Sequence, residues 1–132
     1  MIYALCFIQE YAGGLSMRQQ QRILHRAADK LGWWITQEVI VEASAAQKPF
    51  ALRPGVPEML QDAAVHDFDV VLVVDKDHLA CSRTELEGML AAFLQNDIHT
   101  FGARNGQWIE PGGRHWMWLP GFELPEDEDE LL

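Results

Sequence analysis

Apolar runs of strand length alternate with longer amphipathic segments along the first hundred residues of the chain. The runs at 2–8 and 69–74 are apolar at almost every position. Strands that are buried on both faces show continuous runs of this kind, whereas half-buried strands alternate apolar and polar residues. We therefore predict central strands at 2–8 and 69–74, and further strands at 34–42 and 98–103.

The segments between these runs carry apolar residues at helical spacing. Residues 16–31 place their apolar side chains on one face, with Ser16 suited to the N-cap and Gly32 to the C-cap. Further helices are expected at about 56–66 and 82–96. Alternation of strands and helices with short connections predicts an α/β fold of three layers around a mainly parallel sheet of four or five strands.

The last part of the chain departs from this alternation. Residues 107–110 and 114–118 flank a Pro-Gly-Gly turn and predict a β-hairpin. We accordingly divide the chain into one domain at 1–105, a hairpin and aromatic extension at 106–122, and an acidic tail at 123–132 that is expected to be disordered.

Negative charge is concentrated at the C-terminal end. The net charge is −10, and six acidic residues lie in the last ten positions, so the rest of the chain carries the other −4. The ten lysines and arginines form no basic block. Proteins that hold DNA neutralise its phosphates with such residues, so direct DNA binding is expected to be weak or absent. The six acids are Glu123, Glu126, Asp127, Glu128, Asp129 and Glu130.

The two cysteines, Cys6 and Cys81, belong to no paired metal-binding motif. Both are expected to be buried free thiols, which favours the cytoplasm. No apolar run approaches the ~18 residues that span a bilayer, and the start of the chain is interpreted as a buried strand rather than a signal peptide. We expect no cofactor.

Several motifs, taken in order, resemble the N-terminal catalytic domain of serine recombinases, the resolvase and invertase family. The resemblance covers about residues 2–105 and implies a three-layer, flavodoxin-like domain with central strand order 2-1-3-4. It rests on Tyr3-Ala4-Leu5-Cys6-Phe7, on Gln20 with Gly32-Trp33 after it, on Arg53-Pro54-Gly55, on the strand Asp69 to Val74, and on Asp77-His78-Leu79-Ala80-Cys81.

The same resemblance shows where the family's chemistry is missing. In that family a serine hydroxyl attacks a DNA phosphodiester, and arginines stabilise the charge that develops on the phosphoryl oxygens. Here Phe7 stands at the serine position and Leu5 at the arginine position two residues earlier. His78 and Cys81 stand at two later arginine positions, and Arg53 remains. We expect an inactive, recombinase-like protein that binds a protein partner, such as an active recombinase or another DNA-processing protein.

Several alternatives stay open. Arg53 and Gln20 are candidates for residual anion binding, although Arg53 is also expected to pair with Asp77 or Glu42. Asp75 and Asp77, with Glu10 and Glu42, end neighbouring strands and are candidates for a divalent metal site. An enzyme with a rebuilt phosphate or metal site here is the second hypothesis, and an acidic DNA mimic is the third. Trp108, Trp116 and Trp118 are candidates for an interaction surface, although packing within the protein is the favoured interpretation.

Overall fold

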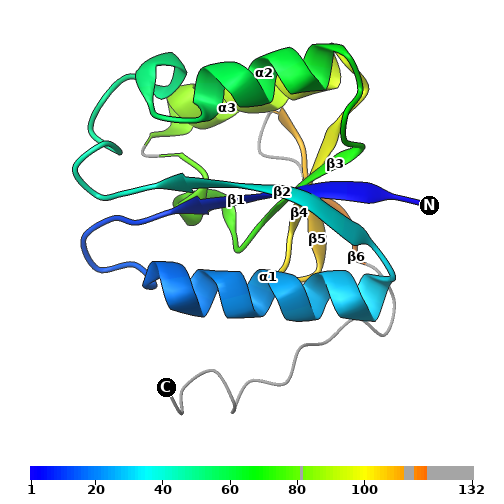
Figure 1. Cartoon of the computed structure of the whole chain (residues 1–132). Helices are drawn as coiled ribbons and strands as arrows, with labels where there is room; N and C mark the ends of the chain where they lie inside the picture. The colour runs from blue at the N-terminus through cyan, green and yellow to red at the C-terminus, as the bar shows by residue number, and fades with distance from the viewer. Residues whose placement is uncertain (81, 112–114, 119–132) are drawn as a thin grey trace.

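The computed structural model describes residues 1–80 and 82–111, and the backbone of residues 115–118. Three layers are visible in Figure 1: α1 lies against one face of a sheet, and α2 and α3 lie against the other. None of the helices in these ranges is long and apolar enough to cross a membrane. The strands are β1 (Tyr3–Gln9), β2 (Trp34–Val41), β3 (Val70–Val73), β4 (His99–Gly102), β5 (Gln107–Ile109) and β6 (His115–Trp118). The helices are α1 (Met17–Leu31), α2 (Val56–Ala64) and α3 (Arg83–Leu94), with 3-10 turns η1 (Phe50–Leu52) and η2 (Lys76–His78).

The order of the strands confirms the predicted α/β fold. The sheet runs β2-β1-β3-β4-β5-β6, and the first four strands of this order are parallel. The predicted hairpin forms as β5 and β6, and β5 pairs antiparallel with β4. The sheet therefore has six strands where four or five were predicted. The hairpin joins the sheet because β4 would otherwise present an edge of unpaired backbone groups.

The central strand β1 divides the core into two parts. Leu5 and Phe7 pack into the cluster that also contains residues of α2 and α3. Cys6 and Ile8 pack into the cluster on the α1 side. Successive side chains of a strand point to opposite faces, so one seven-residue strand supplies both cores. This arrangement explains why the run is apolar at almost every position.

Helix α1 begins and ends with the predicted caps. The Ser16 Oγ accepts a hydrogen bond from the backbone N–H of Gln19, and the Gln19 side chain accepts one from the backbone N–H of Ser16. Gly32 ends the helix in the left-handed conformation at φ 74°.

Gly55 precedes α2 at φ 86°, and a Cβ there would lie 3.2 Å from the Cγ1 of Val39. Glycine is needed at this position both for its conformation and for the close approach of β2.

Candidate functional site

Phe7 lies in the C-terminal half of β1 and is completely buried, with an exposed fraction of 0%. Its ring centroid lies 6.1 Å from that of Phe50 in η1. Leu5 lies on the same face of the strand and belongs to the same apolar cluster. The face where the resemblance places the catalytic serine is therefore filled by packed hydrocarbon.

Arg53 follows η1 and is 2% exposed. Its Nε donates to the backbone carbonyl of Lys48 at 2.9 Å, and its Nη1 donates to the Oε1 of Gln9 at 3.0 Å. Its Nη2 donates to the Oε2 of Glu85 at 2.8 Å. The guanidinium carbon also lies 5.6 Å from the centre of the Phe50 ring. Each of the three guanidinium nitrogens thus has an acceptor within the fold.

The expected partners of Arg53 were wrong. Asp77 and Glu42 are both exposed, and the carboxylate that Arg53 contacts belongs to Glu85 in the first turn of α3. Ser82 caps this helix and accepts a hydrogen bond from the Glu85 backbone N–H. An acidic residue three positions after an N-cap is favoured by the helix dipole, and here the same residue turns its side chain towards the buried arginine.

The buried side chain of Gln20 connects α1 to the end of β1 through hydrogen bonds. Its Nε2 donates to the backbone carbonyls of Gln9 and Leu15, both at 2.9 Å. Its Oε1 accepts from the backbone N–H of Gln9 at 3.2 Å. Both ends of the amide side chain therefore hold the backbone where β1 ends.

His78 in η2 is held from two sides. Its Nδ1 lies 2.7 Å from the Oδ1 of Asp75, and its Nε2 lies 3.0 Å from the backbone N of Leu15. Because that N–H can only donate, Nε2 is the acceptor and Nδ1 carries the proton that is donated to Asp75. The ring also packs against Tyr11, with centroids 4.9 Å apart. The imidazole therefore connects the loop before α1 to the turn that follows β3.

Asp75, which accepts from His78, also pairs with Arg104, whose Nη1 lies 3.2 Å from the second carboxylate oxygen of Asp75. Burial raises the pKa of Asp75, but hydrogen bonds from the imidazole and backbone N–H of His78, together with the charge of Arg104, lower it by more. The net effect is a pKa below the usual value for an aspartate. Asp75 is therefore held in the ionised form.

Replacing Asp75 by asparagine is expected to weaken the acid dependence of folding. Since the pKa is lower in the folded than in the unfolded chain, ionised Asp75 stabilises the fold above about pH 5, and this contribution is lost as the pH falls through the folded pKa. Asp75→Asn should lower the free energy of unfolding at pH 7 by about 1–3 kcal/mol and flatten its fall in acid. Urea titrations between pH 7 and 3 measure both effects. Asp77→Asn, an exposed change in the same turn, is the control, and equal acid curves for Asp75→Asn and the unmodified chain would contradict the assignment.

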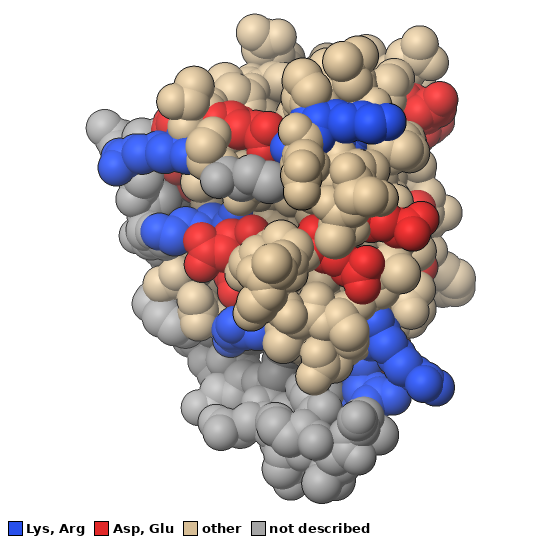
Figure 2. Space-filling model, turned by 90° about the vertical axis from the view of Figure 1, so that its left-hand side faces the viewer, with Lys and Arg blue, Asp and Glu red and all other residues tan. Residues whose placement is uncertain are grey.

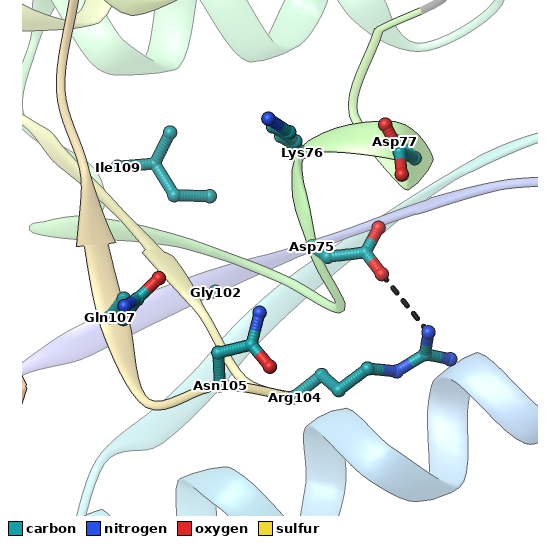
Figure 3. Close-up of a pocket in the computed structure, with 8 residues that line it drawn as sticks. All are labelled: Asp75, Lys76, Asp77, Gly102, Arg104, Asn105, Gln107 and Ile109. Atoms are coloured by element: carbon teal, nitrogen blue, oxygen red, sulfur yellow. Dashed lines mark ion pairs between the residues drawn. The ribbon is translucent and has the colours of Figure 1, made fainter. Parts of the chain in front are cut away.

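A pocket of about 190 Å³ opens beside this group, at the C-terminal ends of β3 and β4. Figure 3 shows Lys76 and Asn105 projecting from opposite sides of the hollow, with the Asp75–Arg104 ion pair along another side. Within residues 1–80 and 82–111, no three histidine, cysteine or acidic side chains are arranged to hold a metal ion. Asp75, Lys76, Asp77, Gly102, Arg104, Asn105, Gln107 and Ile109 line the pocket.

The face of the molecule at this end of the strands is of mixed charge. Acidic side chains run across its middle, and separate basic side chains lie above and below them (Figure 2). Carboxylates at the centre of a surface repel the phosphates of a nucleic acid. Among the described residues, this face therefore has no continuous basic surface of the kind that a DNA backbone requires.

Cys6 points to the opposite face of β1 from Phe7 and is completely buried. Burial, with a smaller effect from the negative charge of Glu38, raises the pKa of its thiol to about 12. The reactive thiolate is then scarce at neutral pH. In a Cys81→Ser variant, we expect iodoacetamide at pH 8 to leave Cys6 unmodified in the native protein and to alkylate it fully in urea. Rapid labelling of the native protein would show that Cys6 is accessible.

The expected interaction surface is described in part. Trp108 is half-buried, and its ring centroid lies 5.1 Å from that of Phe101 and 5.9 Å from that of Trp33. It packs within the protein on the α1 side of the sheet. The side chains of Trp116 and Trp118 lie outside the described part of the chain, as do Cys81 and the whole of 119–132.

Three residues of this site were missed in the sequence: Gln9, Glu85 and Arg104. Gln9 ends an otherwise apolar run, which marks a polar side chain that enters the core. Arg104 follows β4, at the edge where parallel strands place ligand sites. The positions of Gln9 and Arg104 in the sequence could have marked them as site residues. Their partners could not be predicted, because these lie far away in the sequence.

The comparisons with known proteins decide the family. Residues 9–114 match the family model described as "Resolvase, N terminal domain". The chain belongs to this resolvase family. The matched range contains Arg53 and His78, and begins after Leu5 and Phe7.

Solved structures of recombinases share the fold of this resolvase-family domain. The N-terminal catalytic domain of TP901-1 integrase superposes with a TM-score of 0.68 at 22% identity, covering 76% of each chain. A resolvase family site-specific recombinase from Streptococcus pneumoniae gives 0.67 at 13% identity, covering 82% of this chain and 76% of the other. The C-terminal catalytic domain of ISC1926 TnpA, an IS607-like serine recombinase, gives 0.64 at 18% identity, with 75% and 68% covered. No curated protein sequence matches the chain significantly.

Proposed function

We propose that this resolvase-family domain does not cleave DNA and acts by binding another protein. The observation that supports this most strongly is the burial of Phe7 at the position of the family's serine nucleophile. A phenyl ring has no group that attacks phosphorus, and this ring packs against Phe50, with its centroid 6.1 Å from that of Phe50. The adjacent Leu5 extends the same apolar surface.

The residues that would hold the phosphate support the same proposal. The guanidinium of Arg53 donates to Gln9, Lys48 and Glu85, so a bound anion would have to displace the Glu85 carboxylate from a buried arginine. His78 is held by Leu15 and Asp75 and presents no free cationic donor. Phosphoryl transfer needs preorganised positive charge around the reacting oxygens, and these contacts direct the remaining polar groups inward.

Strand-cleavage assays test the catalytic half of the proposal. The full chain is incubated with supercoiled plasmid carrying family recombination sites, and covalent protein–DNA adducts are sought after denaturation. An active family recombinase serves as the positive control. We expect no nicking and no adduct. A 5′-linked adduct that disappears when one residue is substituted would disprove inactivity.

The binding half is tested with an active serine recombinase as the partner. Adding this protein to a working recombination reaction is expected to change the extent of recombination, because a domain of the same family offers similar contact surfaces. An unrelated acidic protein of the same size is the control for charge effects. An unchanged reaction, together with no complex in sedimentation, would exclude this partner.

The pocket beside Asp75 supports a second candidate function, the binding of a small phosphate-containing or polar ligand. It lies at the C-terminal ends of parallel strands, where α/β sheets commonly place ligands, and it contains Lys76 and Arg104. A thermal-shift screen with nucleotides, inorganic phosphate and divalent metals tests this function. A ligand should raise the melting temperature of the unmodified chain and not that of Arg104→Ala. If no compound changes the melting temperature, the candidate loses its support.

A further inference from the structure

Helix α1 carries four basic residues at four-residue intervals. They are Arg18, Arg22, Arg26 and Lys30, and we call them the α1 basic stripe. With a rise of 1.5 Å per residue, the stripe extends over about 18 Å. Asp29 is the one acidic residue of this helix, so α1 is a strongly positive element in a protein whose net charge is −10.

The C-terminal half of the stripe, Arg26 and Lys30, lies on the flank of α1 that faces away from β2, whereas Arg18 and Arg22 lie on the outward side of the helix. On one flank of α1, the side chains of Gln21 and His25 reach Glu38 of β2, at 3.0 and 2.7 Å. At about 100° per residue, Arg26 and Lys30 lie on the opposite side of the buried helix face from these two residues. Because β2 is the edge strand next to β1, that opposite flank faces β3, β4 and β5.

On this side of the sheet, β4 and β5 have no helix over them in the described part of the chain. Figure 1 places α2 and α3 on the other face, and α1 contacts β1 and β2. Trp33, Phe101 and Trp108 cover the surface instead. A strip of sheet that no described helix covers therefore lies between the α1 basic stripe and the strand that leads to the C-terminus.

Arg22 adds an observation of a different kind. Its Nη1 is buried, yet it has no hydrogen-bond partner in the structure. A buried donor without an acceptor is costly, and most such donors in proteins are paired. A carboxylate or phosphate oxygen beside α1 would supply the missing acceptor.

The chain itself contains a segment of the required chemistry. Residues 123–130 carry six carboxylates and follow β6, which ends at Trp118. In the sheet register Trp118 lies opposite Gln107, and Gln107 lies opposite Gly102, so β6 ends at the edge of the sheet where α1 begins.

The segment is long enough to reach α1. Four strand spacings separate β6 from β1, and at about 4.8 Å each they amount to about 19 Å. Because the stripe extends about 18 Å along α1, its far end at Lys30 lies roughly 26 Å from the end of β6 in the plane of the sheet. A fully extended chain covers at most about 17 Å between residues 118 and 123, and about 31 Å between residues 118 and 127. The carboxylates in the second half of the segment can therefore lie against the α1 basic stripe without strain in the connection.

We propose that the α1 basic stripe is the docking surface for residues 123–130 of the same chain, which cross the aromatic-covered, helix-free face of β4 and β5 to reach it. The carboxylates lie along the positive charges of the stripe and provide an acceptor for the buried Nη1 of Arg22. Docking would also cover a row of cations that could otherwise attract nucleic acid phosphates. This inference does not depend on the partner in the proposed function.

Zero-length crosslinking with a carbodiimide tests the contact on the full chain. The reagent joins lysine amines to carboxylates in direct contact, and Lys30 lies on the stripe while Lys48 and Lys76 lie elsewhere. We expect the tryptic peptide that contains residues 115–132 to couple to Lys30 in the monomer and not to the other two lysines. The yield should fall severalfold in 1 M salt, because the screening length falls from about 30 Å at 0.01 M to about 3 Å.

A pair of matched variants separates docking from chance contact. Arg22→Gln removes one charge of the stripe and keeps Lys30 and the acidic segment, so the crosslink yield should fall severalfold. Arg83→Gln removes an equal charge from α3, on the other face of the sheet, and should leave the yield unchanged. Equal yields in the two variants would overturn the proposal.

Two further outcomes would also overturn it. A crosslink confined to the dimer band would show that the segment of a second copy occupies the stripe. Binding of a single-stranded oligonucleotide that is equally tight in the unmodified chain and in a variant with its six acids changed to amides would show that residues 123–130 do not cover the stripe. We expect the amide variant to bind the oligonucleotide more tightly at low salt.

Discussion

Replacing Phe7 by serine is expected to destabilise the domain strongly without producing a strand-cleaving enzyme. Phe7 is completely buried and packs against Phe50, so the change removes a ring from a closed core. Truncation of a buried phenylalanine costs about 3–5 kcal/mol. The new hydroxyl would face the apolar cluster, where an unpaired polar group adds a further penalty. The new serine would therefore stand in apolar surroundings.

Urea unfolding followed by circular dichroism measures the loss, and the adduct assay on plasmid DNA measures any recovered chemistry. Phe7→Leu is the matched control, because it keeps an apolar side chain of smaller volume and should cost less than Phe7→Ser. Both assays are run at a temperature where Phe7→Ser is still folded. A covalent adduct from Phe7→Ser would show that the rest of the catalytic site is intact. A loss below about 1 kcal/mol would show that the ring is not a core element.

Replacing Arg53 by alanine is expected to lower the free energy of unfolding by about 3–5 kcal/mol, the usual result of removing one partner of a buried ion pair. The change would take the guanidinium donors from Gln9 and Glu85 and leave a cavity beside Phe50. Arg53→Lys should recover part of this loss only, since an ammonium group cannot supply directed donors to three separate acceptors.

Arg104→Ala is the control for Arg53→Ala, since Arg104 also pairs with a carboxylate but is half-exposed. Its loss should be at most about 1 kcal/mol. The same unfolding measurements, repeated with millimolar inorganic phosphate, separate a structural role from residual anion binding. Phosphate that stabilises the unmodified chain, together with a small effect of Arg53→Ala, would contradict the closed network and favour an anion site at Arg53.

Both predictions concern residues of one packed region of the fold. Phe50 lies against the ring of Phe7 and also under the guanidinium of Arg53, so the two positions belong to one packed unit. Here an apolar ring and an internally paired arginine stabilise the same region of the sheet.

The local pattern of apolar and polar residues was sufficient to predict the helices and strands and the side of the sheet that each residue faces. The continuous apolar run predicted β1 as a central strand, because a strand buried on both faces needs apolar residues at even and odd positions. The caps of α1 at Ser16 and Gly32 were predicted for the same reason: their interactions lie within a few residues of one another. The resemblance to serine recombinases added the order of the four parallel strands.

The tertiary structure decided which distant polar groups meet. Arg53 pairs with Glu85, which lies 32 positions away on α3, and His78 accepts from Leu15, which lies 63 positions away. Periodicities of two and 3.6 residues specify the faces of strands and helices, but they carry no information on which of several exposed or buried acids lies opposite a given arginine. The partner of Arg53 is decided by the packing of α3 and η1 over the sheet. The pairing of the hairpin with β4 is also a tertiary effect, because the edge of β4 exists only once the strands are assembled.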